Sequence, residues 1–260
     1  YGLLAVFAVI VLIIGLVYVS KNGVDGLLGT DKSTSSTTDD EETNVQTETL
    51  AEVENPYKAV DPATALAPDL ATAKSELASL QVKERASKAG YSRDQFGPAW
   101  DDVDGNKCNT RDDILRRDLT NVRFKVRTHA CTVISGTLND PYTGKTIEFK
   151  RGKKTSSAVQ IDHVVALSNA WQTGAQDLTA EQRRQLANDP ENLLAADGPA
   201  NQQKSDADAA DWLPSNTAYR CTYVARQVHV KAKYKLWVTA DEKKVMERVL
   251  NSCKGTNPTK

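Results

Sequence analysis

The sequence predicts an α+β domain that follows one membrane-spanning helix and a disordered stalk. Three observations lead to this prediction: a long uncharged apolar stretch near the start, a segment rich in Ser, Thr and acidic residues after it, and a change of texture at Tyr91. From Tyr91 onward, aromatic residues, turn residues and alternating apolar positions occur together, as in a folded domain. The predicted units are residues 1–20 as a transmembrane anchor, 21–60 as a linker, 61–90 as a helical spacer and 91–260 as the globular domain.

The anchor is predicted from residues 2–19, which contain no charged side chain. As a helix they would span about 27 Å, close to the thickness of a bilayer's hydrocarbon core. No small-x-small cleavage site follows, so we expect an uncleaved anchor, with a cleaved signal peptide as the alternative. The linker has no large apolar face to bury and is expected to be disordered. The Ala- and Leu-rich segment after it is expected to be a helix that begins near Asp61 or Thr64 and ends at Gly90.

The two halves of the chain differ in charge. Residues 1–90 carry 7 Lys and Arg against 13 Asp and Glu, a net charge of 7 − 13 = −6. Residues 91–260 carry 26 and 21, a net charge of 26 − 21 = +5. A basic domain behind an acidic segment indicates an anionic partner, although uneven surface charge alone is the alternative.

The four cysteines are Cys108, Cys131, Cys221 and Cys253, and none has the CxxC spacing of a structural zinc site. In an exported chain an even number of cysteines favours two disulfides, and four buried thiols are the alternative. Three pairings are possible. Sequence order favours Cys108 with Cys131 and Cys221 with Cys253.

Local patterns predict the elements of the globular domain. A short helix is expected at 110–119, capped by Asn109 or Thr110, and another at 240–250. Alternating apolar positions predict strands at 121–127, 131–138 and 145–150, with a turn at 140–144. On the first of these strands, alternation would place Arg123, Lys125 and Arg127 on one face.

The residues with the clearest chemistry follow in the segment VQIDHVVALS. An apolar strand delivers Asp162 and His163 side by side, and both can face one site only if the strand bends there. After a turn at 188–190, a short strand is expected at 192–195. A helix should then begin with Gly198 as its cap and Pro199 as its first residue. Asn201 and Lys204 would share one face of that helix.

These segments resemble a known family. DHVVALS followed by ENLLAADGPANQQKSD is similar to the ββα-metal, or His-Me finger, core of the HNH endonucleases. Residues 91–253 also resemble secreted HNH proteins of actinobacteria related to the GmrSD C-terminal domain. The stretches that carry this wider resemblance are YSRDQFGPAWDDVDGNKCNTRDDILRRDL and YRCTYVARQVHVKAKYKL.

The resemblance implies a role for each polar residue of the motif. His163 would be the general base, Asp162 and Asn201 the metal ligands, and Asn192 the residue that ties down the loop holding the base. Two oxygen ligands favour one divalent metal, Mg²⁺ or, as the alternative, Mn²⁺. The implied reaction is metal-dependent hydrolysis of phosphodiester bonds, in DNA with little sequence preference, on the outer face of a bacterial membrane. The alternatives are an RNA-directed nuclease and a catalytically idle protein that binds nucleic acid or a partner; no protein partner is itself predicted.

The remaining basic residues and histidines lie outside the motif. Phosphate contacts are expected from Arg151, Lys153, Lys154 and, on the helix, Lys204, against the alternative of a solvated basic face. His129, expected among strand residues, and His229 have no partner at ligand spacing, so structural or surface roles are expected for them. Arg93 and Arg111 belong to the resembling stretch, but the sequence assigns them no role.

Overall fold

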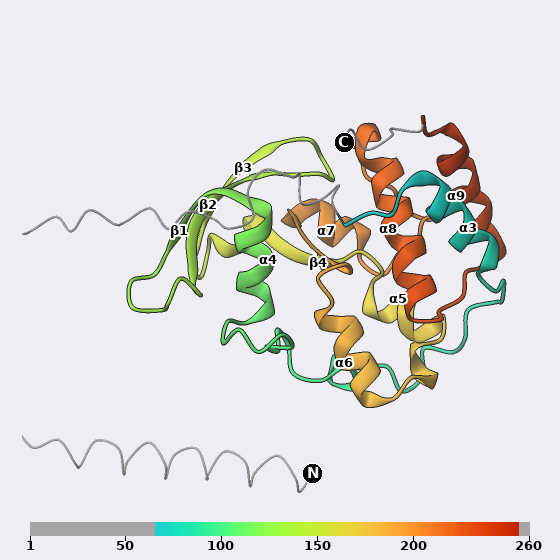
Figure 1. The fold of residues 1–260 in the computed structure, drawn as a ribbon, viewed down its shortest axis with the longest axis horizontal. Coiled ribbons are helices and arrows are strands. Elements are labelled where there is room, and N and C mark those ends of the chain that lie inside the picture. The colour runs from blue at the N-terminus through green and yellow to red at the C-terminus, as the bar shows by residue number, and fades with distance from the viewer. Residues whose placement is uncertain (1–65, 255–260) are drawn as a thin grey trace, which may run out of the picture. The chain divides into compact units, whose positions relative to one another are not determined.

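A computed structural model describes residues 66–254 of the chain. The predicted anchor at residues 1–20 and linker at 21–60 lie outside the described residues, so both stay predictions. Within residues 66–254, no helix has both the length and the apolar character needed to cross a membrane. This part of the chain is an α+β unit, as the sequence predicts, with two small antiparallel sheets; the larger sheet lies at the left in Figure 1 and most helices lie at the right.

The larger sheet has three antiparallel strands in sequence order. They are β1 (Leu119–Phe124), β2 (Val133–Asn139) and β3 (Thr146–Lys150). Helix α4 (Thr110–Asp118) precedes β1 and packs beside the sheet (Figure 1). The Asn109 side chain caps α4 by accepting the N–H of Asp112, one of the two caps that the sequence predicts.

The first strand is shorter than predicted. β1 ends at Phe124, and its pairing with β2 is irregular on both sides of Arg123. Beyond it, Arg127, His129 and Ala130 have φ angles of 62°, 51° and 59°, which belong to a turn-rich loop. The prediction that three basic side chains share one face of a strand from 121 to 127 is therefore wrong, and His129 lies in this loop rather than in a strand.

The smaller sheet pairs β4 (Val159–His163) with β5 (Leu193–Asp197) in antiparallel register. Core residues cover both of its faces. Leu194 and Ala196 pack with the C-terminal helices, whereas Leu193 and Ala195 pack under α4 and the three-stranded sheet. A strand that is buried on both faces has a continuous apolar sequence, which accounts for the run Leu193–Ala196.

Helix α7 (Gly198–Lys204) follows β5 directly. Its cap is Asp197, whose Oδ1 accepts the N–H of Ala200 at 2.8 Å, so the prediction of Gly198 as the cap is wrong by one residue. A Cβ atom on Gly198 would lie 2.0 Å from the carbonyl oxygen of Ser157. Only glycine allows the start of α7 to lie this close to the backbone in front of β4.

Three helices form the other end of the unit: α3 (Leu70–Ser79), α8 (Arg220–Lys233) and α9 (Ala240–Ser252) (Figure 1). Asp69 caps α3, and the helix ends well before Gly90. Ala73 and Leu77 of α3 are buried against α8 and α9. The segment expected to be a spacer thus contributes to the core of the globular unit.

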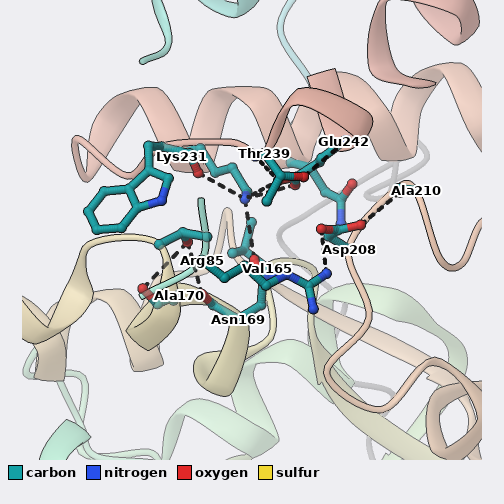
Figure 2. A network of polar contacts seen from close by, with 12 residues as sticks. Arg85, Val165, Asn169, Ala170, Asp208, Ala210, Lys231, Thr239 and Glu242 are labelled. Carbon is teal, nitrogen blue, oxygen red and sulfur yellow. Dashed lines mark hydrogen bonds and ion pairs between the residues drawn. The ribbon is translucent and has the colours of Figure 1, made fainter. Parts of the chain in front are cut away.

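A buried ion pair holds α8 to α9. Lys231 Nζ lies 2.8 Å and 2.9 Å from the two carboxylate oxygens of Glu242 and 3.3 Å from Asn169 Oδ1. Figure 2 shows these three residues together. Asn169 belongs to α5 (Leu167–Gln172). Glu242 also completes the capping box that starts α9 at Thr239. One charged pair therefore joins three helices.

Helix α6 (Ala180–Asn188) lies between α5 and β5 in the sequence and begins with a capping box at Thr179. It packs against the short 3₁₀ helix η1 (Arg93–Phe96), whose Phe96 is buried with residues of α5 and α6. The other short 3₁₀ helices are η2 (Ser156–Ala158), η3 (Ala175–Asp177) and η4 (Thr217–Tyr219).

Two disulfides close the unit. Cys108 is joined to Cys131, and Cys221 is joined to Cys253. These are the pairs that sequence order favours. The first ties the residue before the α4 cap to the loop before β2, and the second ties the start of α8 to the end of α9.

Candidate active site

The polar residues of the motif lie on β4 and on the segments that pack around it. Strand alternation directs Asp162 and His163 to opposite faces of β4, because the strand continues regularly to His163. The bend that the sequence predicts follows His163 instead of falling between the two residues. Asp162 contacts Lys204 of α7, and His163 contacts Ala187 of α6.

Asp162 is held by two side chains in the interior. Tyr142 donates its hydroxyl to Asp162 Oδ2 at 2.6 Å. Lys204 Nζ lies 3.0 Å from both carboxylate oxygens and 2.8 Å from the carbonyl oxygen of His163. Lys204 is fully buried, so it is not placed to contact a phosphate in this structure, contrary to the expectation from helix facing. A buried carboxylate needs such partners, because removal from water is costly for an unpaired charge.

His163 is held by one hydrogen bond and one aromatic ring. Its Nε2 lies 2.8 Å from the carbonyl oxygen of Ala187 on α6. A carbonyl only accepts, so Nε2 carries the hydrogen and Nδ1 of the neutral ring is the free acceptor. The imidazole is stacked on the indole of Trp100, with ring planes 14° apart and ring centres 6.2 Å apart.

The protonation of His163 follows from this environment. Burial lowers the pKa of His163 from 6.5 to about 4, although the Ala187 carbonyl and the Asp162 carboxylate oppose the shift. Arg93 and Lys204 add to the lowering through their positive charge. The imidazole is therefore neutral at neutral pH and able to accept a proton.

Asn192 holds the chain that follows His163. Its side-chain oxygen accepts the N–H of Val165 at 2.8 Å, and its side-chain nitrogen donates to the carbonyl of Leu186 at 3.2 Å. Its own carbonyl accepts the N–H of Val164 at 2.7 Å. Fully buried Asn192 thus connects the residues after His163 to α6, the helix that also provides the Ala187 carbonyl.

Asn201 lies on α7 beside β4. Its Nδ2 donates to Gln160 Oε1 at 2.9 Å. Gln160 and Asp162 point to the same face of β4, so Asn201 and Asp162 lie on the same side of the smaller sheet. The bond to Gln160 uses the amide nitrogen of Asn201, so its amide oxygen is the atom that could bind a cation.

The other basic residues divide into paired and exposed ones. Arg151 is committed to the fold, because it forms an ion pair with buried Asp112 and donates to the carbonyl of Val133. Lys153 and Lys154 are exposed in the turn before β4. Arg111 is half-buried near the ring of Phe149, and burial lowers its pKa.

Two residues of the site were missed by the sequence reasoning. Tyr142, which holds Asp162, lies in a segment that reads only as a turn, and Trp100 lies 63 positions before His163. No spacing rule connects either residue to the DH pair. His229, in contrast, lies on α8 with its Nδ1 2.9 Å from Glu76 of α3, which is a structural position.

Comparison with known proteins places the chain in a family. Residues 109–249, more than half of the chain, match the family described as GmrSD restriction endonucleases, C-terminal domain. The chain belongs to this family, whose enzymes are nucleases and therefore hydrolases of nucleic acid.

A relative supports the assignment over a longer stretch. An uncharacterized secreted protein of Arthroderma benhamiae is 42% identical over 188 residues, which cover 72% of this chain and 87% of the relative. No solved structure matches the chain. The relative is fungal, so the actinobacterial kinship and bacterial setting expected from the motifs stay predictions.

Proposed function

We propose that the chain is a metal-dependent endonuclease of the HNH type, which hydrolyses phosphodiester bonds in DNA with little sequence preference. The observation that carries the proposal is the state of His163: a neutral imidazole whose Nε2 is committed to Ala187, leaving Nδ1 as a proton acceptor. Membership of a nuclease family supports the reaction class. The arrangement of β4, β5 and α7, a strand pair followed by a helix, is consistent with the ββα-metal core.

In the proposed reaction, His163 takes a proton from the attacking water while the water oxygen bonds to phosphorus. The bond to the leaving oxygen breaks, and that oxygen gains a proton from solvent. General-base catalysis typically contributes about 10²–10⁴-fold to a rate. Asn192 would keep the base in place, since it fastens the chain beside His163 to the helix that carries Ala187.

The residues present fit a hard divalent metal. The donor set is the carboxylate of Asp162 and the amide oxygen of Asn201, and Mg²⁺ is commonly held by one or two protein oxygens and several waters. Asp162 accepts hydrogen bonds from Tyr142 and Lys204, but a carboxylate has about four acceptor positions, so it keeps capacity for a further partner. Mg²⁺ is the first choice and Mn²⁺ the second. When bound, the metal supplies positive charge to the phosphate and the leaving oxygen.

Lys153 and Lys154 are proposed as phosphate contacts, since both are exposed in the turn that leads into β4. Such contacts position a nucleic acid without reading its sequence, which is consistent with loose specificity. Arg151 is proposed only as the support of that turn, because of its ion pair with Asp112.

The proposed setting is extracellular, with the nuclease held outside a bacterial membrane by residues 1–20 or released by cleavage. Two disulfides and the printed description of the relative as secreted support an oxidising, exported location.

The test is nicking of supercoiled plasmid by the full chain, oxidised and purified in mild detergent, with Mg²⁺ or Mn²⁺. Parallel reactions contain EDTA, the His163→Ala variant, or the control His129→Ala, which alters a histidine outside the site. We expect metal-dependent nicking that is lost with His163→Ala and kept with His129→Ala. Cleavage of RNA but not DNA would favour the RNA-directed alternative. A folded protein that binds but never cuts nucleic acid would favour the idle binding protein.

A further inference from the structure

Trp100 lies over the proposed base, although it belongs to a segment that precedes the region matched by the family. Its indole is nearly parallel to the imidazole of His163 and also packs against the core under the three-stranded sheet. His163 is left with only 8% of its surface exposed. The indole is therefore part of the wall around the base.

The hydrogen bond to Ala187 alone does not fix the imidazole. It restrains the position of Nε2 but leaves the ring able to tilt about the Nε2–oxygen line. A stacked aromatic surface restrains this tilt, because the two rings keep contact only while they stay close to parallel. Together the two contacts fix the direction in which Nδ1 points.

The same helix provides both restraints. α6 supplies the Ala187 carbonyl, and it also holds the Trp100 segment on both sides of the indole. Arg183 Nε donates to the carbonyl of Gln95 at 2.7 Å, and Arg184 forms an ion pair with Asp101 at 2.7 Å. A shift of the segment relative to α6 would therefore move the indole relative to the imidazole.

The backbone of Trp100 has an unusual conformation. Its φ angle is 59°, in the left-handed region that bulky residues rarely adopt. Neighbouring contacts keep it there: Trp100 O accepts the N–H of Thr110 at 3.3 Å, and the Thr110 hydroxyl donates to the carbonyl of Asp101. These contacts fix the backbone that carries the indole.

We propose that Trp100 is a positioning residue for His163, which aligns the imidazole so that Nδ1 faces the attacking water. This inference rests on the proposed function, in which His163 is the base. Trp100 acts through His163 and not on the phosphate, so its loss lowers kcat and leaves KM for the nucleic acid nearly unchanged.

The kinetic test uses the full chain and compares Trp100→Ala, Trp100→Phe and Trp237→Ala. The last is a matched loss of a half-buried indole, one that lies against Lys83 and Gly174. We expect kcat to fall roughly 10- to 100-fold in Trp100→Ala, because small misplacements of a reacting group have effects of this size. Trp100→Phe, which keeps an aromatic face, should recover most of the rate, and Trp237→Ala should keep kcat per folded molecule.

A second measurement reports on the ring itself. The chain has three histidines, so a sample with ¹³C-labelled histidine gives three ring signals, and His163→Ala identifies the one from His163. Loss of the indole ring current in Trp100→Ala should shift that signal, and the other two should stay in place. If Trp100→Ala does not fold, Asp101→Asn serves instead, because it weakens the bond to Arg184 and leaves the indole present.

The outcomes separate the two claims. An unchanged kcat in folded Trp100→Ala, beside an inactive His163→Ala, overturns the positioning role alone. A rise in KM with unchanged kcat would also overturn it, since that result describes a substrate contact. Full activity in His163→Ala would overturn the proposed function itself. An unmoved His163 signal would show that the rings do not stack in solution.

Discussion

The ammonium group of Lys204 lies 3.0 Å from both carboxylate oxygens of Asp162, in a place where Lys204 is fully buried and Asp162 is 5% exposed. The hydroxyl of Tyr142 completes the arrangement. Asp162 is thus a proposed metal ligand whose charge is already balanced by the protein, and removal of either partner would leave a buried charge uncompensated.

Replacing Lys204 by methionine should destabilise the protein by about 3–5 kcal/mol, because it leaves a buried carboxylate without its cation. Urea denaturation monitored by circular dichroism measures the change. The double variant Asp162→Asn with Lys204→Met should recover much of the loss, since neither charge is then left alone. A single Lys204→Met variant as stable as the wild type would show that the pair is not buried as described.

Gly198→Ala should displace the start of α7, because the new Cβ would lie 2.0 Å from the carbonyl oxygen of Ser157. Overpacking of this kind typically costs about 1–3 kcal/mol. Since Asn201 lies one turn further along α7, the metal concentration needed for half-maximal cleavage should rise as well. Gln202→Ala, at an exposed position of the same helix, is the control and should change neither quantity. A normal metal requirement in Gly198→Ala would argue against Asn201 as a ligand.

The metal-free protein should lose stability as the pH falls from about 6.5 to about 4. In this window the unfolded chain protonates His163, whereas the folded chain does not, because burial lowers the pKa of His163 to about 4. The shift in pKa from 6.5 corresponds to about 3 kcal/mol of unfolding free energy. This stability is fully present above pH 6.5 and is lost by pH 4. Chemical denaturation in EDTA at several pH values measures this. Between about pH 6.5 and pH 4, the difference in unfolding free energy between wild type and His163→Gln should change by about 3 kcal/mol. A difference that stays constant over this pH range would contradict the prediction.

Removing either disulfide should destabilise the domain by about 3 kcal/mol. The bridges join residues 23 and 32 positions apart, and loop-closure entropy differs little between loops of these lengths. The variants Cys108→Ser with Cys131→Ser, and Cys221→Ser with Cys253→Ser, should therefore show similar losses in thermal unfolding. A much larger loss for one pair would mean that this bridge also supports native packing.

Much of the fold follows from local patterns. The helix at Thr110–Asp118 has its cap and its charges in place, and the alternating segments after it form the three-stranded sheet. The predicted strand from 121 to 127 was wrong where the chain turns back through left-handed residues, as at Arg127 and His129. Neither residue type by itself indicates a positive φ. The start of α7 was misplaced by one residue, since both Asp197 and Gly198 are common caps.

The site was only partly predictable. The DH pair, Asn192 and Asn201 could be singled out because the segments that hold them resemble the motif of a known family. The contacts that set their environment come from far along the chain: Tyr142 to Asp162, Trp100 to His163 and the carbonyl of Ala187 to the same imidazole. Lys204 shows the limit most clearly. Its helical facing was predicted, but whether its ammonium faces solvent or a buried carboxylate depends on packing that no local pattern describes.

The position of Trp100 also has a practical consequence for anyone who trims this chain. A protein that started at Asn109, where the family match begins, would keep Asp162, His163, Asn192 and Asn201. It would lack the indole over the base and the carboxylate that pairs with Arg184, and Cys131 would become an unpaired thiol. The region that the family match covers is therefore shorter than the proposed site, and a truncated protein that proved inactive would say nothing against that site.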